Sequence, residues 1–88
     1  MGVNEIQRIP VQSSNLKSVG YDEKRSTLEV EFLDKSIYRY SRVPKYRHEE
    51  LLNAKSKGRY FSRYIRDNKD YSCTKIYPKY SERRISVC

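Results

Sequence analysis

Hydrophobic and polar positions alternate through the middle of the chain, and this alternation predicts two strands that are each half buried. Leu28, Val30 and Phe32 share one side of the first strand, and Tyr38 and Tyr40 share one side of the second. Side chains on the same side of two paired antiparallel strands pack against one another. These five residues are therefore expected to face the core.

The polar break between the two strands predicts how they pair. A three-residue loop of residues 34–36 places Phe32 opposite Tyr38 and Val30 opposite Tyr40, so that aromatic side chains meet apolar ones. A two-residue loop would slip the register by one residue and turn one set of side chains to the other face. The three-residue loop is therefore predicted.

Apolar residues before this hairpin indicate one more strand. Leu16, Val19 and Tyr21 lie in a short extended segment, and the charged residues 22–26 form a turn into the hairpin. Strands that follow each other through short turns usually pair in order, which gives a three-stranded antiparallel meander. Residues 1–10 contain few large apolar side chains, and a flexible N-terminal segment is expected there.

After the hairpin, the apolar spacing changes from two residues to three or four, which is the period of a helix. Pro44 suits the first position of this helix, and Leu51 and Leu52 lie on one broad side of it. Gly58 predicts that the helix ends near Ser56, because glycine commonly follows the last helical turn.

A second short helix is predicted over residues 58–67. Phe61 and Ile65 share one face of it, where they can cover the sheet. Residues 71–76 could form a short extended segment, and the basic residues 72–88 are expected to form a partly disordered C-terminal tail. The predicted fold is α+β, a three-stranded antiparallel meander followed by two helices packed on one face, in a single domain over residues 11–71.

Positive charge is concentrated in the second half of the chain. The net charge is +8, and residues 1–43 carry seven basic and six acidic side chains, whereas residues 44–88 carry twelve and five. A field of this sign attracts anionic partners such as nucleic acid, an acidic protein face or anionic lipid. No segment approaches the roughly 18 consecutive apolar residues of a membrane-spanning helix, and no signal-peptide region is present, so a cytoplasmic protein is expected.

Catalytic and metal-binding chemistry have little support in the sequence. Cys73, Cys88 and the single histidine, His48, are too few for a metal site, and the cysteines are expected to be free thiols. No nucleophile motif or glycine-rich phosphate loop is present, and His48 is expected at the edge of the core. The sequence therefore predicts a protein that is not an enzyme and that holds neither a metal nor a cofactor.

Basic and aromatic residues alternate on the second predicted helix, which makes it the candidate binding site. Spacings of four and three residues put Arg59, Arg63 and Arg66 along one side of the helix. Arginine binds phosphate in a bidentate manner and stacks on aromatic rings and bases. A solvated basic face without a ligand is the alternative. The candidate nucleic-acid-binding residues are Arg59, Arg63, Arg66, Lys55, Lys57, Tyr60 and Tyr64.

Tyr38 and Tyr40 admit two interpretations. Aromatic rings on an exposed sheet face can stack on the bases of single-stranded RNA. The predicted register instead puts both rings on the face of Val30 and Phe32, which the helices are expected to cover. Core packing, with the hydroxyl groups reaching polar partners, is therefore the favoured interpretation.

The order and spacing of several short motifs resemble the KTSC domain family. These motifs are Gly20-Tyr21-Asp22, Leu28-Glu29-Val30, Tyr38-Arg39-Tyr40, Val43-Pro44 and Ser56-Lys57-Gly58 followed by Tyr60-Phe61. The resemblance covers residues 11–71. Two departures are Lys35-Ser36, where a glycine is expected in the tight turn, and Arg47-His48, where apolar residues are expected.

The resemblance also carries functional implications. The family is named for its occurrence at the C-terminus of some lysyl-tRNA synthetases, and it also occurs as small stand-alone proteins in bacteria and their phages. Its function is open, with RNA binding as the proposal. The resemblance therefore implies a small binding domain and favours RNA as the ligand.

The basic helix supports two functional hypotheses. The first is a small module that binds RNA or single-stranded nucleic acid through this tyrosine-flanked helix. The second is a protein–protein interaction module, for instance a phage-encoded factor whose basic face docks on an acidic face of a host or defence protein. A homodimer is compatible with both hypotheses, and membrane binding is not expected.

Overall fold

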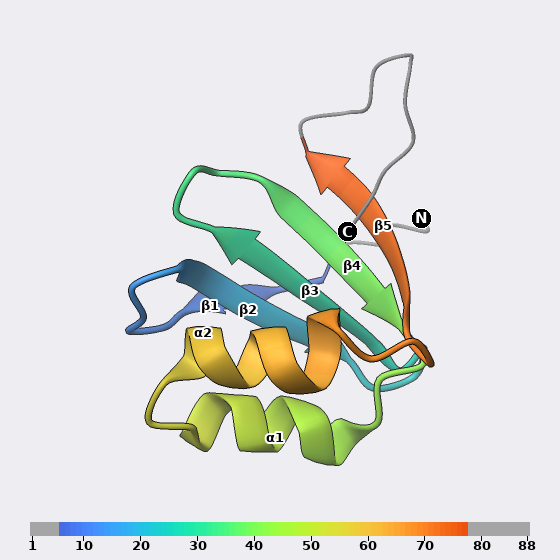
Figure 1. Cartoon of the computed structure of the whole chain (residues 1–88). Helices are drawn as coiled ribbons and strands as arrows, with labels where there is room; N and C mark the ends of the chain where they lie inside the picture. The colour runs from blue at the N-terminus through green and yellow to red at the C-terminus, as the bar shows by residue number, and fades with distance from the viewer. Residues whose placement is uncertain (1–5, 78–88) are drawn as a thin grey trace.

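The computed structural model describes residues 6–77, and its centre is an antiparallel sheet of five strands in the order β1-β2-β3-β4-β5. The two helical segments separate β4 from β5 in the chain (Figure 1). The α+β class is confirmed, but the sheet has five strands instead of the predicted three. The strands are β1 (Arg8–Pro10), β2 (Leu16–Asp22), β3 (Thr27–Phe32), β4 (Ile37–Ser41) and β5 (Ser72–Tyr77).

Both additional strands lie in segments that were expected to be flexible or tail-like. β1 pairs with β2, and β5 pairs with β4. Short polar segments gain order from the hydrogen bonds of the neighbouring strand, which their own composition does not reveal. β5 agrees with the short extended segment expected over residues 71–76, whereas no strand was predicted at residues 8–10. Residues 1–5 and 78–88 lie outside the described residues.

Gly20 in β2 makes room for the chain that enters β1. A Cβ atom at this position would lie 2.4 Å from the carbonyl oxygen of Gln7, which is closer than the two atoms can approach. The backbone before β1 therefore crosses directly over Gly20. A larger residue at this position would push β1 away from the edge of the sheet.

The β3–β4 hairpin has the predicted faces but not the predicted register. Val30 lies opposite Tyr38, and Leu28 lies opposite Tyr40. Compared with the prediction, the pairing has moved by two residues. Because side chains alternate with a period of two, this shift leaves every side chain on its predicted face.

The hairpin loop explains the shift. The N–H of Phe32 donates to the carbonyl oxygen of Ser36 at 2.9 Å, which closes a loop of residues 33–35 rather than 34–36. Lys35 takes the left-handed conformation that ends such loops, with a φ of 78°. This is the tight turn in which a glycine was expected, and the lysine adopts the conformation that glycine would adopt more easily.

Two helical segments lie side by side on one face of the sheet (Figure 1). The first is α1 (Lys45–Asn53), and the second consists of α2 (Lys57–Tyr60) followed without a break by the π-helical η1 (Phe61–Arg66). Both predicted helices are present. However, the first ends at Asn53 rather than near Ser56, and Gly58 lies inside α2.

The core lies between this face of the sheet and the helices. The ring of Phe61 meets Tyr40 edge to face at 5.4 Å and Phe32 at 5.5 Å between ring centroids. Pairs of this geometry add about 0.5–1.5 kcal/mol beyond their burial. The buried core residues are Leu16, Val19, Leu28, Val30, Tyr40, Val43, Leu51, Phe61 and Ile65.

Cys73 in β5 is disulfide-bonded, so the expectation of a free thiol is wrong for this residue. Cys88 lies outside the described residues. Among residues 6–77, no group of three His, Cys, Asp or Glu side chains could hold a metal ion. In the same range, no helix has the length and apolar character needed to cross a membrane.

Candidate nucleic-acid interface

The start of the α2–η1 segment is fixed by two local contacts. The hydroxyl oxygen of Ser56 caps the helix by accepting a hydrogen bond from the N–H of Arg59 at 3.4 Å. Gly58 packs against Asn15, because a Cβ atom at Gly58 would lie 3.2 Å from the Asn15 Cγ. These contacts set which side of the segment faces the sheet and which side carries the arginines.

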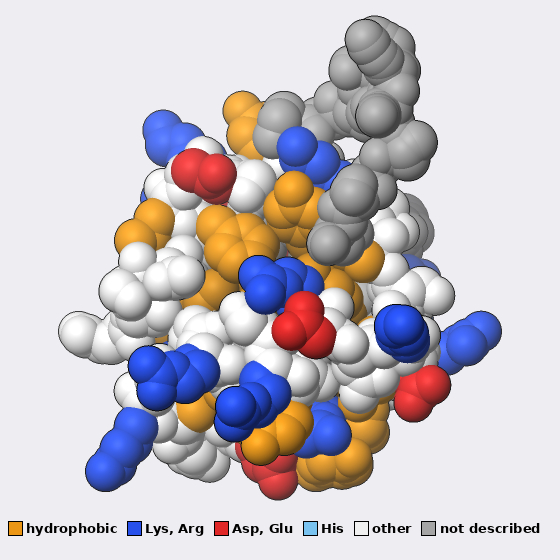
Figure 2. Space-filling model, viewed as in Figure 1, with side chains coloured by type: hydrophobic (Ala, Val, Ile, Leu, Met, Phe, Trp, Pro, Cys, Tyr) orange, Lys and Arg blue, Asp and Glu red, His pale blue; other side chains and the backbone are white. Residues whose placement is uncertain are grey.

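Arg59 and Arg63 lie on the exposed side of the segment, whereas Phe61 and Ile65 are buried on the opposite side. In the part of the chain that the structure describes, neither arginine forms an ion pair. Figure 2 shows basic side chains spread across the helical face of the molecule. Both guanidinium groups therefore keep their donors for water or for an anionic ligand.

Arg66 is the last residue of the α2–η1 segment, and its environment differs from that of Arg59 and Arg63. The N–H of Asp67 donates to the carbonyl oxygen of Ser62, five residues back, at 3.1 Å, which makes the last turn π-helical. Arg66 lines a groove beside Tyr38 and Tyr40, and its Nε lies 3.2 Å from Asp67 Oδ1. A helical wheel of about 100° per residue does not describe this wider turn. Arg66 consequently lies beside the sheet rather than only in solvent with the other two arginines.

Tyr60 and Tyr64 contact each other and Arg47 between the two helices. Their ring centroids lie 4.7 Å apart, and the Arg47 guanidinium carbon lies 5.0 Å from the Tyr64 centroid. The Tyr60 hydroxyl donates to the Glu50 carboxylate of α1. Tyr64 is 39% exposed, whereas Tyr60 is half buried. These tyrosines join α1 to α2–η1, so much of their ring surface is already in contact.

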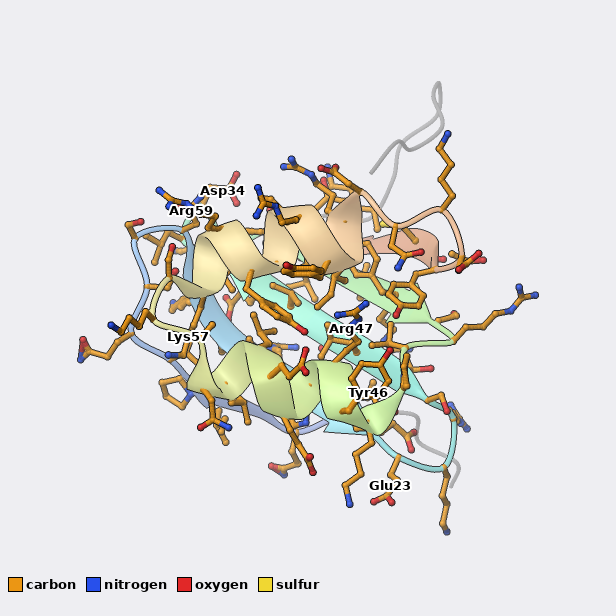
Figure 3. The ribbon with its side chains drawn as sticks, turned by 60° about the horizontal axis from the view of Figure 1, so that its bottom comes forward. Glu23, Asp34, Tyr46, Arg47, Lys57 and Arg59 are labelled. Carbon is orange, nitrogen blue, oxygen red and sulfur yellow. The ribbon has the colours of Figure 1, made fainter. Side chains whose placement is uncertain are left out.

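Arg47 stands where the family resemblance led us to expect an apolar residue. It lies between the helices (Figure 3), where it donates to the hydroxyl oxygens of Tyr60 at 3.2 Å and Tyr71 at 3.3 Å. These hydrogen bonds raise the pKa of Arg47 above its ordinary value. Its guanidinium carbon also lies 5.1 Å from the Tyr46 ring centroid. A half-buried arginine is tolerated here because tyrosine rings and hydroxyl groups surround it.

The two predicted lysines flank the start of α2. Lys55 is exposed in the loop between the helices. The Nζ of Lys57 donates to the carbonyl oxygen of Ala54 at 3.2 Å, so this side chain lies back along the loop. Lys55 is therefore the lysine that adds charge in solvent beside the two exposed arginines.

The two tyrosines of β4 differ in burial. Tyr40 is 2% exposed, and this burial raises the pKa of its hydroxyl group to about 12. Core packing is confirmed for Tyr40. Tyr38 is only half buried, and with Phe32 it lines the groove that Arg66 borders. This groove was not predicted from the sequence, although one interpretation of Tyr38 did place its ring on an exposed face of the sheet.

The opposite face of the sheet carries an ion-pair network. Glu29 is 2% exposed and binds both Arg8 and Arg39, with 2.6 Å between its Oε1 and the Arg39 Nε. The Ser18 hydroxyl donates to Glu31 at 2.9 Å. Two carboxylates among these arginines make the face a poor site for phosphate.

His48 lies at the edge of the core, as expected. Its ring stacks on Tyr21 with centroids 5.0 Å apart and an interplanar angle of 13°. Burial lowers the pKa of His48, and the nearby Glu49 opposes this shift. The arrangement gives the imidazole a packing role.

The elements that carry these side chains match a known family. The model of the KTSC domain matches residues 12–71, which begin before β2 and end after η1. The chain belongs to the KTSC domain family. Within this KTSC domain protein, β1 and β5 lie outside the matched residues.

A solved KTSC domain has the same fold. The crystal structure of the KTSC domain protein YPO2434 from Yersinia pestis is 39% identical, with a TM-score of 0.75, and the match covers 82% of this chain and 99% of that chain. An uncharacterized protein of Stutzerimonas stutzeri (strain A1501) is 46% identical over 57 residues, which are 65% of this chain and 80% of the relative.

The KTSC domain also resembles part of much larger proteins. A lysine–tRNA ligase of Nostoc sp. (strain PCC 7120 / SAG 25.82 / UTEX 2576) is 42% identical over 60 residues. These residues are 68% of this chain but 11% of the ligase. The similarity concerns this one small domain and not the rest of the ligase.

Proposed function

We propose that this KTSC domain is a non-enzymatic module that binds RNA or single-stranded nucleic acid through the α2–η1 segment. The observation that carries the proposal is the exposed pair Arg59 and Arg63, which forms no ion pair within residues 6–77. Lys55 is exposed in the preceding loop. Like charges on one helix repel each other, and an anionic ligand would relieve this repulsion.

Nucleic acid is the anion that fits best. Residues 44–88 have seven more basic than acidic side chains, which favours a polyanion over a single small anion. Relatives named lysine–tRNA ligase act on an RNA, which supports RNA as the ligand of a domain that they share. Arginine forks can bind phosphate through paired hydrogen bonds.

A salt titration tests the proposal. Fluorescence anisotropy would measure the binding of labelled single-stranded RNA, single-stranded DNA and duplex DNA by the wild type and by Arg59→Gln/Arg63→Gln. Single-stranded ligands should bind more weakly as salt rises, with a linear log-log plot. The double variant should flatten the slope by about 0.7 for each phosphate that it no longer neutralises.

A charge-matched variant serves as the control. Lys24→Gln/Arg25→Gln removes the same charge from the exposed β2–β3 turn, next to Glu23. Figure 3 shows Glu23 at the opposite end of the view from Arg59. The control should keep most of the affinity and slope. Equal losses in the two variants, or no binding by the wild type at low salt, would refute a site on α2–η1.

A further inference from the structure

A groove lies between the β3–β4 hairpin and the end of η1, where the helices leave part of the sheet uncovered. Its volume is about 620 Å³, which is within the range of roughly 300–1,000 Å³ typical of small-ligand sites. Phe32, Tyr38 and Tyr40 contribute its aromatic lining, and Arg66 and Asn15 contribute polar groups. Figure 2 shows hydrophobic side chains at the surface beyond the helices, with basic side chains nearby.

The aromatic floor of the groove is held in place by the core. The rings of Phe32 and Tyr38 meet edge to face at 5.7 Å, and Phe32 meets the buried Phe61 in the same manner at 5.5 Å. Phe61 is 2% exposed, so it anchors Phe32 directly and Tyr38 through Phe32. Rings fixed in this way lose little entropy when a planar group stacks on them.

Basic side chains border the floor on two sides. Arg66 comes from η1, and 47% of its side chain is exposed. Lys75 of β5 pairs with Tyr38 across the sheet, and its Nζ lies 5.8 Å from the Tyr38 ring centroid. Both side chains are long enough to swing toward a phosphate beside the ring, because neither is buried.

An acidic group at one edge of the groove determines how a bound nucleotide would be oriented. Asp34 lies in the hairpin loop at the groove edge, and hydrogen bonds from the Ser36 hydroxyl and N–H lower the pKa of its carboxyl group. A charged carboxylate repels phosphate, so a nucleic-acid backbone would run along Arg66 and Lys75. The base would then point toward the hairpin.

We propose that this groove binds an unpaired nucleobase of a single-stranded nucleic acid, which stacks on Tyr38 and Phe32 while Arg66 and Lys75 hold the flanking phosphates. The inference rests on the proposed function and assigns it a second contact region. Stacking on Tyr60 and Tyr64 is less available because those rings already contact each other and Arg47. A base inside a duplex is stacked on both sides and cannot enter, so the groove selects single strands.

Photocrosslinking of the wild-type protein tests this placement directly. A single-stranded oligouridine that contains one 5-iodouridine, as RNA and as DNA, would be irradiated with the full chain, and the crosslinked tryptic peptides would be identified by mass spectrometry. Trypsin separates Tyr38, in residues 36–39, from Tyr64, in residues 64–66. We expect crosslinks at Tyr38 or Phe32. Crosslinks only at Tyr60 or Tyr64 would overturn the proposal.

Binding measurements provide the second test. Tyr38→Leu should weaken single-strand binding about tenfold, as expected for the loss of a stacked base, with an unchanged salt slope and unchanged duplex binding. Tyr38→Phe keeps an aromatic ring and should therefore bind single strands as tightly as the wild type does. Tyr46→Leu removes a tyrosine that is 52% exposed on α1, away from the groove (Figure 3), and should have no effect.

The outcomes separate this inference from the proposed function. If single strands bind with a steep salt dependence but Tyr38→Leu binds like the wild type, the groove is refuted and the α2–η1 site stands. If the wild type binds no nucleic acid at low salt, both are refuted. If Tyr38→Leu does not fold, the crosslinking map of the wild type decides.

Discussion

The helix-side face of the sheet has a covered end and an open end, built from the same kinds of residue. At the covered end, Leu28 and Tyr40 lie opposite each other and are buried with Phe61 and Ile65, and all four are at most 2% exposed. At the open end, Tyr38 lines a groove. Tyr38 and Tyr40 are two residues apart on one strand and on one face, yet one packs in the core and the other reaches the surface.

The difference shows that position relative to the helices, and not residue type, decides the role of an aromatic side chain here. The helices cover only one part of the sheet (Figure 1). Where Phe61 reaches the strands, an aromatic residue contributes to folding through burial. Beyond Phe61, the same residue type keeps an exposed surface that a planar ligand can use.

The largest expected effect comes from opening the covered end. Phe61→Ala removes the ring that contacts both Tyr40 and Phe32, and it should lower the free energy of unfolding by about 3–5 kcal/mol. Tyr38→Ala at the open end should cost only about 1 kcal/mol, because its side chain is already half exposed. Urea unfolding followed by circular dichroism measures both. Equal costs would mean that the open end is part of the core.

A smaller effect is expected from the polar contact that holds the covering helices together. Arg47→Met keeps the length of the side chain but removes its hydrogen bonds to Tyr60 and Tyr71, and it should cost about 1–2 kcal/mol of unfolding free energy. The exposed Arg63→Met is the matched control and should change stability by less than about 0.5 kcal/mol. An Arg47→Met protein as stable as the control would show that the helices do not depend on this contact.

Much of the covered end could be predicted from the sequence, because alternation and helical spacing report burial directly. The faces of Val30 and Tyr40 and the packing side of Phe61 and Ile65 follow from periods of two and of three to four. The exact register of the β3–β4 hairpin could not be predicted in this way. The pairing of the hairpin depends on which loop residue adopts the left-handed conformation. A glycine would have indicated that position in the sequence, whereas Lys35, which adopts the conformation here, does not.

The open end was much harder to predict. Arg66 of the π turn lines the groove beside the sheet, and β5 adds Lys75 next to Tyr38. Both depend on contacts between segments far apart in the chain. A π turn has no strong sequence signal, and the local pattern that predicts an extended segment at residues 71–76 does not reveal that this segment pairs with β4.

The smallest effect concerns His48, which packs at the covered end. Burial lowers the pKa of folded His48 below the 6.5 of the unfolded chain, so at mildly acidic pH the unfolded state binds more protons. Its stability contribution is complete above about pH 6.5 and is lost as the pH falls through that value toward the folded pKa.

The melting temperature should therefore fall as the pH is lowered from about 7.5 to about 5, where histidine is the side chain that ordinarily titrates. His48→Phe keeps a ring that can stack on Tyr21 but cannot take up a proton, so its melting temperature should fall less over the same interval. Differential scanning fluorimetry across this interval would measure the two profiles. Parallel profiles for the wild type and the variant would show that His48 is not the source of the acid sensitivity. A steeper fall in the variant would contradict the assigned role of His48.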